Sequence, residues 1–331
     1  MMFKRRTVLI SSMLLILFFF SFLGINFAQD QPKDILTIAS VNFHAVWGDK
    51  QSNLERIKGF IEAAAKRGAD MIVFPETALT GYDWDKNPGM HKENAETVPG
   101  PSTNEIAELT KKYGVYALFG LVEEDKDNPD TIYNSVAVSG PEGLIGSYQK
   151  MHLPFTENYW ATHGDKPFMF DTPWGLVGVG ICYDSYLFAE LPRYYAALGA
   201  RIYINATALS NFPGWKEYFL TSMKMRAIEN MMFVVSSNLV GKDLNSNFPG
   251  FSFIVGPADQ FHDVRIYAGP ASEEIEELVM ATIDLSKVDK MRKHYPLFSE
   301  STFSGKPDWR LSEYIEMLDD IAAKTNLGEY K

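Results

Sequence analysis

The chain has 331 residues, of which 46% are hydrophobic and 14% aromatic, and its formal net charge is −11. This composition excludes intrinsic disorder, because a chain this rich in aromatic residues can bury enough apolar surface to fold. A single cysteine excludes a disulfide scaffold and a cysteine-based zinc site. The excess of acidic residues argues against nucleic acid as a partner, since phosphate binding needs a basic surface.

The first 28 residues have the pattern of an export segment. Lys4, Arg5 and Arg6 precede an apolar run over residues 8–27, which is the layout of a signal peptide. The run is also about as long as a membrane-spanning helix, so a single uncleaved anchor stays open as an alternative. A buried N-terminal helix is the third interpretation. In the first two, the basic residues stay in the cytoplasm and the remaining chain lies outside it, in an extracytoplasmic compartment.

From Asp34 onward, strand-like and helix-like runs alternate. Strands are expected at 35–39, 71–74, 115–122, 132–138, 144–149, 174–181, 201–206, 233–238, 251–255, 262–267 and 278–283. Helices are expected at 54–65, 106–113, 188–198 and 215–230. This alternation indicates an α/β protein, and the strands that follow one another without helices indicate sheets packed face to face. The absence of a linker-like stretch predicts one domain over residues 34–300.

The C-terminal part of the chain, residues 301–331, is expected to be a tail with an amphipathic helix. One helical stripe carries its apolar side chains, Leu311, Tyr314, Ile315, Leu318 and Ile321. We expect this stripe to pack against the body of the protein, in preference to binding a partner. The acidic segment 273–277 is expected to be a solvated loop or the start of a helix.

The only cysteine, Cys182, stands at the end of a strand-like run. In that run Val177, Val179 and Ile181 alternate with glycines, so one strand face is apolar and the other is bare enough for close approach of a backbone or ligand. Residues at such a strand end lie near the crevice where α/β sheets bind ligands. A free cysteine is also often just a buried small residue, so this segment alone leaves both interpretations open.

Two charged residues at other strand ends favour the catalytic interpretation. Glu76 follows the buried run 72–75, and Lys150 follows the strand 144–149. Either residue alone is an ordinary turn carboxylate or solvated lysine. Together with Cys182 they form a chemical set: the carboxylate can take the thiol proton, and the ammonium can stabilise the charge that develops. The same base can then activate water to release an acyl group.

These motifs, in this order, resemble the nitrilase (carbon–nitrogen hydrolase) superfamily. The segments that carry the resemblance are Phe74-Pro75-Glu76, Lys150-Met151-His152-Leu153-Pro154-Phe155, Gly180-Ile181-Cys182-Tyr183-Asp184, Glu190-Leu191-Pro192-Arg193, Arg226-Ala227-Ile228-Glu229-Asn230 and Gly250-Phe251-Ser252. Each motif is weak alone, but the first three, which contain Glu76, Lys150 and Cys182, are specific when they occur in this order. The match spans about residues 36–285. The resemblance implies a four-layer α-β-β-α sandwich that often pairs into homodimers through its helices.

The resemblance also implies roles for individual residues. Glu76 would be the general base, Lys150 the electrostatic stabiliser and Cys182 the nucleophile. The backbone N–H of Tyr183 would share the oxyanion hole. Glu157 would be a second acid that positions the substrate and water, although this segment is one residue shorter here than in several relatives.

Tyr82 is a further residue that we expect to line the substrate pocket, with aromatic packing as its alternative. The resemblance implies no metal and no cofactor. The implied substrate is a small-molecule amide or nitrile, and an amide is favoured.

Several other functions are compatible with parts of this sequence. A nitrilase proper and an amine acyltransferase would use the same fold, but the membrane-bound acyltransferases of the superfamily carry several spanning helices and this chain has at most one. A catalytically silent, surface-anchored binding protein is the alternative from another class. A papain-like site lacks its local signature around Cys182, and a His-Glu-x-x-His zinc motif does not occur in the sequence.

Overall fold

The computed structural model describes residues 31–83, 89–260, 263–300, 305–306 and 309–325. The chain divides into two units, residues 1–32 and 33–331, and every element named below belongs to the second. The expected export segment lies outside the described residues. None of the helices in the described ranges has the length and apolar character needed to cross a membrane.

The first of two large sheets is mixed and has six strands. Its order is β14 (Glu277–Asp284), β1 (Ile35–Asn42), β2 (Met71–Val73), β3 (Tyr116–Glu124), β4 (Ile132–Gly140) and β5 (Gly143–Gln149). The central strands β1, β2 and β3 run parallel, and the outer pairs are antiparallel. Parallel central strands bring the carboxyl ends of β1, β2 and β3 to the same edge of the sheet.

The second sheet repeats this arrangement. Its order is β13 (Val264–Ala268), β12 (Phe253–Pro257), β9 (Phe233–Asn238), β8 (Ile202–Thr207), β7 (Gly175–Ile181) and β6 (Phe168–Thr172), with β7, β8 and β9 parallel. A separate two-stranded hairpin is made of β10 (Val240–Asp243) and β11 (Ser246–Pro249).

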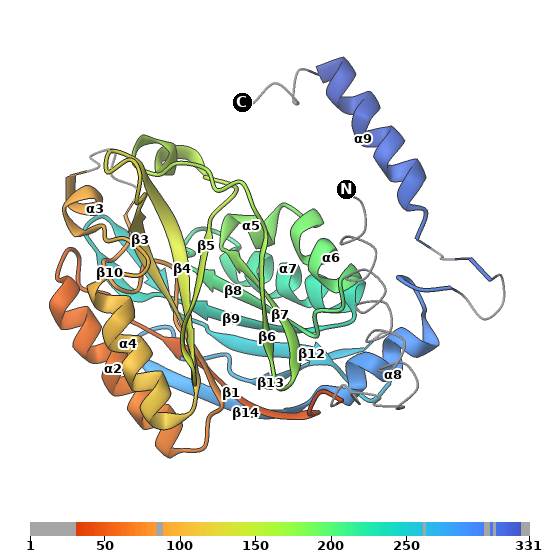
Figure 1. Cartoon of the computed structure of the whole chain (residues 1–331), viewed down its shortest axis with the longest axis horizontal. Helices are drawn as coiled ribbons and strands as arrows, with labels where there is room; N and C mark the ends of the chain where they lie inside the picture. Colours follow the sequence, from red (N-terminus) through yellow and green to blue (C-terminus); the bar gives the residue numbers. More distant parts are fainter. Residues whose placement is uncertain (1–30, 84–88, 261–262, 301–304, 307–308, 326–331) are drawn as a thin grey trace, which may run out of the picture. The chain divides into compact units, whose positions relative to one another are not determined.

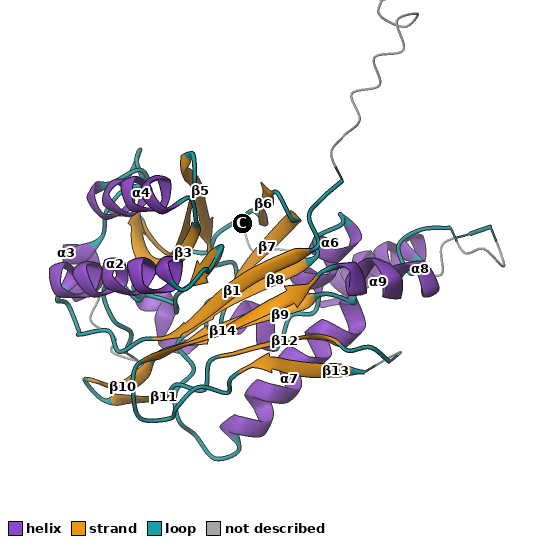
Figure 2. Cartoon of the chain, turned by 90° about the horizontal axis from the view of Figure 1, so that it is seen from below, coloured by secondary structure: helices purple, strands orange, loops and turns teal. Residues whose placement is uncertain are grey.

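Helices cover the outer face of each sheet (Figure 1). The first sheet carries α2 (Lys50–Lys66), α3 (Gly89–Asn94) and α4 (Pro101–Tyr113). The second carries α5 (Tyr183–Tyr186), α6 (Glu190–Ala197), α7 (Trp215–Asn230) and α8 (Ser286–His294). Figure 2 shows α2 and α4 on one side of the strands and α7 on the other. The α-β-β-α layering expected from the resemblance is therefore confirmed.

The alternation of side chains along β1 explains the two cores. Leu36 and Ile38 belong to the core that includes both facing sheets, whereas Ala39 and Val41 belong to the core beneath α2 and α4. Successive side chains of a strand point to opposite faces, so a strand buried on both sides is apolar throughout. The continuous apolar runs in the sequence are strands of this kind.

Two sequence-based expectations differ from the structure, and the structure decides between two alternatives at a third place. The strand expected at 174–181 is shorter, and a separate strand, β6, precedes it across a tight turn at Gly175 with φ of 95°. Of the two alternatives for segment 273–277, the loop is confirmed; it leads into β14, whose first residue is Glu277. The tail forms a helix, α9 (Leu311–Thr325), but none of its residues is buried, so the expected packing against the body is not observed.

Candidate active site

Three reactive side chains lie at the carboxyl ends of strands from both sheets. Glu76 follows β2 and Lys150 follows β5 in the first sheet, whereas Cys182 follows β7 in the second. Glu76 and Lys150 are fully buried, and Cys182 is partly buried and packs against the core between the sheets. The charges of Glu76 and Lys150 both act on the thiol. The structure therefore brings together the three residues that the sequence singled out.

Lys150 lies between two buried carboxylates. Its Nζ donates to Oε1 of Glu76 at 2.6 Å and to Oε2 of Glu157 at 2.8 Å. Glu157 is on the short 3-10 helix η1 (Phe155–Tyr159) and is also fully buried. We call Glu76, Lys150 and Glu157 the acid–lysine cluster. The sequence-predicted fourth residue thus contacts the lysine directly.

Three further donors complete the hydrogen bonds to the two carboxylates. The backbone N–H of Ala208 donates to Oε2 of Glu76 at 2.7 Å. The hydroxyl of Tyr82 donates to Oε2 of Glu157 at 2.8 Å. The side-chain amide of Asn134 donates to Oε1 of both acids, at 2.7 Å to Glu76 and 2.8 Å to Glu157. All four carboxylate oxygens are therefore hydrogen-bonded, as buried charges require. Tyr82 is buried against Glu157.

The backbone is strained where it presents these side chains. Positive φ angles occur at Thr77 (45°), directly after Glu76, at Phe155 (42°), two residues before Glu157, and at Cys182 itself (46°). Such conformations are unfavourable for residues with a Cβ and tend to cluster at functional sites. The bare strand face before Cys182 is filled by the rings of Tyr195 and Tyr203, which lie where Cβ atoms of the glycines would be.

Burial and the neighbouring charges shift the pKa values of Glu157 and Lys150 within the acid–lysine cluster. Burial raises the pKa of Glu157, Lys150 lowers it and Glu76 raises it again, with a result of about 7. Burial acts to lower the pKa of Lys150, but the negative charges of Glu157 and Glu76 outweigh this effect, and the pKa is raised. Lys150 is therefore a permanent positive charge in this site.

The thiol is protonated in this environment. Burial raises the pKa of Cys182 and the charge of Glu76 raises it further, whereas Lys150 and a hydrogen bond with Thr207 act in the opposite direction. Since the net effect is an increase, the nucleophile becomes a thiolate only when a base removes its proton. Tyr183 begins α5, so its N–H has no intrahelical acceptor.

The buried carboxylate of Asp184 connects the segment around Lys150 to the end of β7, which precedes Cys182. Asp184 accepts from Tyr148 Oη at 2.8 Å and from the backbone N–H groups of Ile181 at 3.2 Å and His152 at 2.9 Å. Tyr148 and His152 flank Lys150 in the sequence, and Ile181 precedes Cys182. Asp184 therefore fixes the position of one sheet's reactive residue relative to the other's.

Comparison with known proteins identifies the family. The family model described as carbon-nitrogen hydrolase matches residues 37–293. The chain belongs to the carbon–nitrogen hydrolase family. The nitrilase of Pyrococcus abyssi is 32% identical over 260 residues, which cover 78% of this chain and 93% of that protein. The omega-amidase NIT2 of Bos taurus is 33% identical over 263 residues, covering 76% of this chain and 90% of that protein.

Solved structures of the nitrilase superfamily share the fold. Nit3 of Saccharomyces cerevisiae superposes with a TM-score of 0.71 at 27% identity, over 81% of this chain and 97% of that one. An amidase from Nesterenkonia sp. superposes with a TM-score of 0.63 at 21% identity, over 79% of this chain and 95% of that one. The resemblance seen in the sequence is confirmed, and this protein is a carbon–nitrogen hydrolase rather than a silent binding protein.

Sequence reasoning missed two residues of this carbon–nitrogen hydrolase site. Asn134 lies inside a strand where polar residues are depleted, and that position was its only signal. Asp184 lies within the cysteine motif, but the motif alone does not indicate a role for it. Within the described ranges, no group of His, Cys, Asp and Glu side chains could hold a metal ion.

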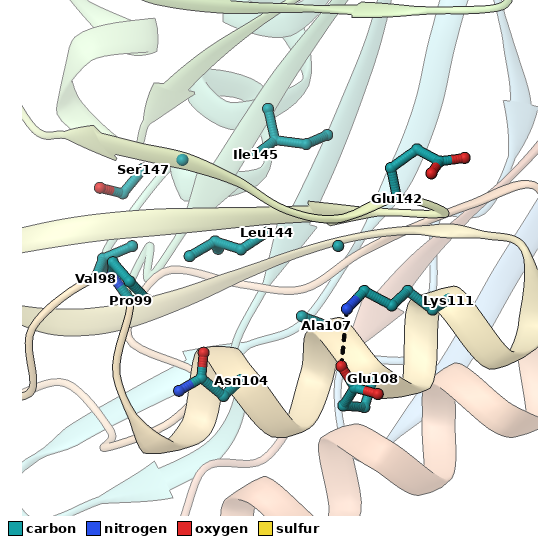
Figure 3. Close-up of a pocket in the computed structure, with 12 residues that line it drawn as sticks. Val98, Pro99, Asn104, Ala107, Glu108, Lys111, Glu142, Leu144, Ile145 and Ser147 are labelled. Atoms are coloured by element: carbon teal, nitrogen blue, oxygen red, sulfur yellow. Dashed lines mark hydrogen bonds and ion pairs between the residues drawn. The ribbon is translucent and has the colours of Figure 1, made fainter.

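A surface cavity of about 590 Å³ opens elsewhere, between α4 and β5 (Figure 3). Its walls include Lys111, which pairs with Glu108 at 2.8 Å, together with Glu142, Ile145 and Ser147. No residue of the acid–lysine cluster lines it, and neither does Cys182. This cavity is therefore distinct from the candidate catalytic site.

Proposed function

We propose that this enzyme hydrolyses a small-molecule amide through a covalent acyl-enzyme on Cys182. The observation that carries the proposal is the buried acid–lysine cluster beside the only thiol. A buried assembly of two carboxylates and one ammonium is expensive to form, and a well-packed apolar core would stabilise a fold at least as well. Perturbed charges of this kind, next to a nucleophile on a strained backbone, are typical of catalytic sites.

Acylation follows from the positions of the groups. The Cys182 sulfur attacks the amide carbonyl carbon while Glu76 takes the thiol proton. The oxyanion receives hydrogen bonds from Lys150 Nζ and from the backbone N–H of Tyr183, where the charge develops. When the tetrahedral intermediate collapses, the C–N bond breaks and the nitrogen takes the proton from Glu76. The products of this half-reaction are a thioester on Cys182 and ammonia or an amine.

Deacylation uses the same groups with water as the nucleophile. Glu76 removes a proton from water, the hydroxyl adds to the thioester carbonyl, and the same oxyanion hole stabilises the intermediate. The C–S bond then breaks, the sulfur recovers the proton from Glu76, and a carboxylic acid leaves. Glu157, held by Tyr82 and Lys150, accepts from the substrate nitrogen or orients the water, and it does not carry protons between substrate and thiol.

The choice of an amide rests on the relatives. One similar protein is named a nitrilase and several are named omega-amidases, and a structural neighbour is named an amidase. The proposed roles suit an amide, because Glu76 can return the thiol proton to the departing nitrogen in a single turn of the cycle.

Ammonia release from a panel of amides and nitriles tests this proposal. We expect release from at least one amide by the wild type and none by Cys182→Ala, whose fold should persist because the side chain lost is small. Mass spectrometry of each variant after mixing with an amide substrate distinguishes the roles of the two acids. Glu76→Gln should form no thioester, whereas Glu157→Gln should still be acylated but turn over roughly 10²-fold more slowly. Turnover by Cys182→Ala at the wild-type rate would overturn the covalent mechanism.

We also propose that the chain is exported and works as a homodimer. The basic start and apolar run support export, and a protein that begins at Gln29 should be soluble and active if that segment is not part of the fold. Exposed apolar side chains around α6, namely Leu187, Tyr194 and Leu198, support a helix-mediated dimer. Light scattering should report a dimer that Tyr194→Glu weakens, and a monomeric wild type would contradict this.

A further inference from the structure

Asn134 contacts every member of the acid–lysine cluster. Its Nδ2 donates to Oε1 of Glu76 at 2.7 Å and to Oε1 of Glu157 at 2.8 Å. Its backbone oxygen accepts from the backbone N–H of Lys150 at 2.8 Å. Asn134 is fully buried in β4. A single neutral side chain is therefore placed between the two acids.

Packing does not account for an amide at this position. Residues two apart on a strand share a face, and Val136 and Val138 continue the face of Asn134 into the core between the sheets. A branched aliphatic residue would fit such a row. Moreover, Asn134 Oδ1 has no hydrogen-bond partner among the described residues, and an unpaired buried acceptor destabilises a fold. The side-chain hydrogen bonds that Asn134 makes are those to the two carboxylates, and these bonds explain why this position holds an amide.

The amide has a clear use between two acids. The groups that face Glu157 are Lys150 from the end of β5, Glu76 from the loop after β2, Tyr82 from the loop before α3, Asn134 from β4 and the thiol of Cys182 from the end of β7. The carboxylates repel each other, and Lys150 offers them only one positive charge. Hydrogen bonds from Asn134 favour the ionised form of Glu157, and they do so without a second cation that would compete for the oxyanion.

We propose that Asn134 is a positioning residue that holds Glu76 and Glu157 together as an ionised pair and so sets the lower pH limit of activity. This inference rests on the proposed function, in which Glu157 acts as an acceptor and Glu76 as the base. Without the amide, the repulsion between the acids is relieved by protonation of Glu157, and the remaining contacts no longer hold both acids in position relative to the thiol.

Asn134→Leu tests this, with Asn230→Leu as a matched control. Asn230 is also fully buried, donates from Nδ2 to a backbone oxygen and has an unpaired Oδ1 among the described residues, but it lies at the end of α7, away from the cluster. We expect Asn134→Leu to lower kcat about 10²-fold with little change in KM, and to move the acidic limb of the kcat profile up by about one pH unit. The control should leave the limb in place.

A spectroscopic readout keeps this test separate from the proposed function. Infrared spectra recorded over a range of pH follow the band of the protonated Glu157 carboxyl, which is identified by its absence in Glu157→Gln. This measurement needs no turnover. Its midpoint should rise in Asn134→Leu and should not move in Asn230→Leu. If no amide is cleaved by the wild type, the proposed function fails, but the infrared midpoint still decides the role of Asn134.

A second variant covers the case in which Asn134→Leu does not fold. Asn134→Asp has the same shape and replaces the donor by a third acid, so it should raise the midpoint at least as far. If a folded variant keeps the wild-type midpoint and the wild-type acidic limb, or if kcat falls equally at every pH, Asn134 is a structural residue and the proposal is overturned.

Discussion

Replacing Gly120 by alanine should displace the catalytic base without touching it. Gly120 lies on β3, beneath the loop that carries Glu76. A Cβ built there would stand 2.1 Å from Thr77 N, 2.5 Å from Pro75 O and 2.6 Å from the carbonyl carbon of Glu76. All three atoms are backbone, so no side chain can rotate away. Ordinary contact begins at 3.4 Å, and the loop or the strand must therefore move by more than 1 Å.

The loop is the part that will move. Gly120 pairs with Val136 in the middle of the β3–β4 ladder, which holds the strand in register. The loop is attached to Gly120 through Gly120 N to Pro75 O at 3.1 Å and Leu79 N to Gly120 O at 3.0 Å. A shift of this size removes the carboxylate from its partners, which lie only 2.6 to 2.7 Å away. We expect kcat to fall about 10²-fold and the fold to lose roughly 1–3 kcal/mol from overpacking.

The assay compares Gly120→Ala with Gly59→Ala in kcat, KM and thermal unfolding. Gly59 lies inside α2, and a Cβ there would meet nothing within 4 Å, so this control should keep its activity and gain about 0.5–1 kcal/mol of stability. Wild-type kcat in Gly120→Ala would refute the reasoning. So would a loss of kcat that merely follows the unfolded fraction as temperature changes, since the base would then be intact in every folded molecule.

Three more predictions concern the neighbours of this base. Tyr82→Phe removes the donor to Glu157 and should lower kcat about tenfold at a stability change of about 1 kcal/mol; a change in KM alone would instead make Tyr82 a substrate contact. Folding raises the pKa of Glu157 from 4.5 to about 7, so the folded state binds this proton more tightly, and the stabilisation is complete below about pH 4.5 and lost as the pH rises through about 7. In urea unfolding, the free energy of unfolding of Glu157→Gln should lack this decline of roughly 3 kcal/mol with rising pH. Burial also raises the pKa of Asp243 to about 6, but this contribution is present in both proteins and cancels in the comparison. Parallel plots of the free energy of unfolding against pH for the two proteins would contradict the assignment to Glu157. Asp184→Asn leaves Ile181 N and Tyr148 Oη facing a poorer acceptor and should lower kcat with a fold weakened by about 1–3 kcal/mol, and unchanged kinetics would show that this carboxylate does not position Cys182.

The reactive residues could be predicted because each follows a strand that is visible in the sequence. Buried strands appear as unbroken apolar runs, and Glu76 and Cys182 each interrupt the pattern at its end. Glu76 and Lys150 lie near each other because the strands before them run in the same direction and end at one edge of the first sheet. Cys182 joins them only because the second sheet packs on the first. Asn134 could not be found in this way, since it lies inside a strand and its partners come from segments 58 and 23 residues distant. Only the packing of the two sheets and of η1 brings these segments together.

The missed elements have similar physical reasons. β10 and β11 have four residues each, too few for a period of two to stand out. The stripe on α9 predicts a helix correctly, because amphipathic spacing is a local property. The surface that covers such a stripe is not local, and the sequence carried no signal of the exposed position that α9 takes.

The charge balance of the site determines how its thiol is used. Glu76 and Glu157 together outweigh Lys150, so ionisation of Cys182 would place a further negative charge in a buried region that is already negative. Burial and Glu76 raise the pKa of the thiol accordingly. A stable ion pair between the Cys182 thiolate and Lys150 is therefore not the resting state here. The proton must leave for Glu76 as the sulfur meets an electrophilic carbon, when the new charge moves onto an oxygen beside Lys150. Lys150, kept charged by both acids, contributes its field throughout the cycle and never its proton.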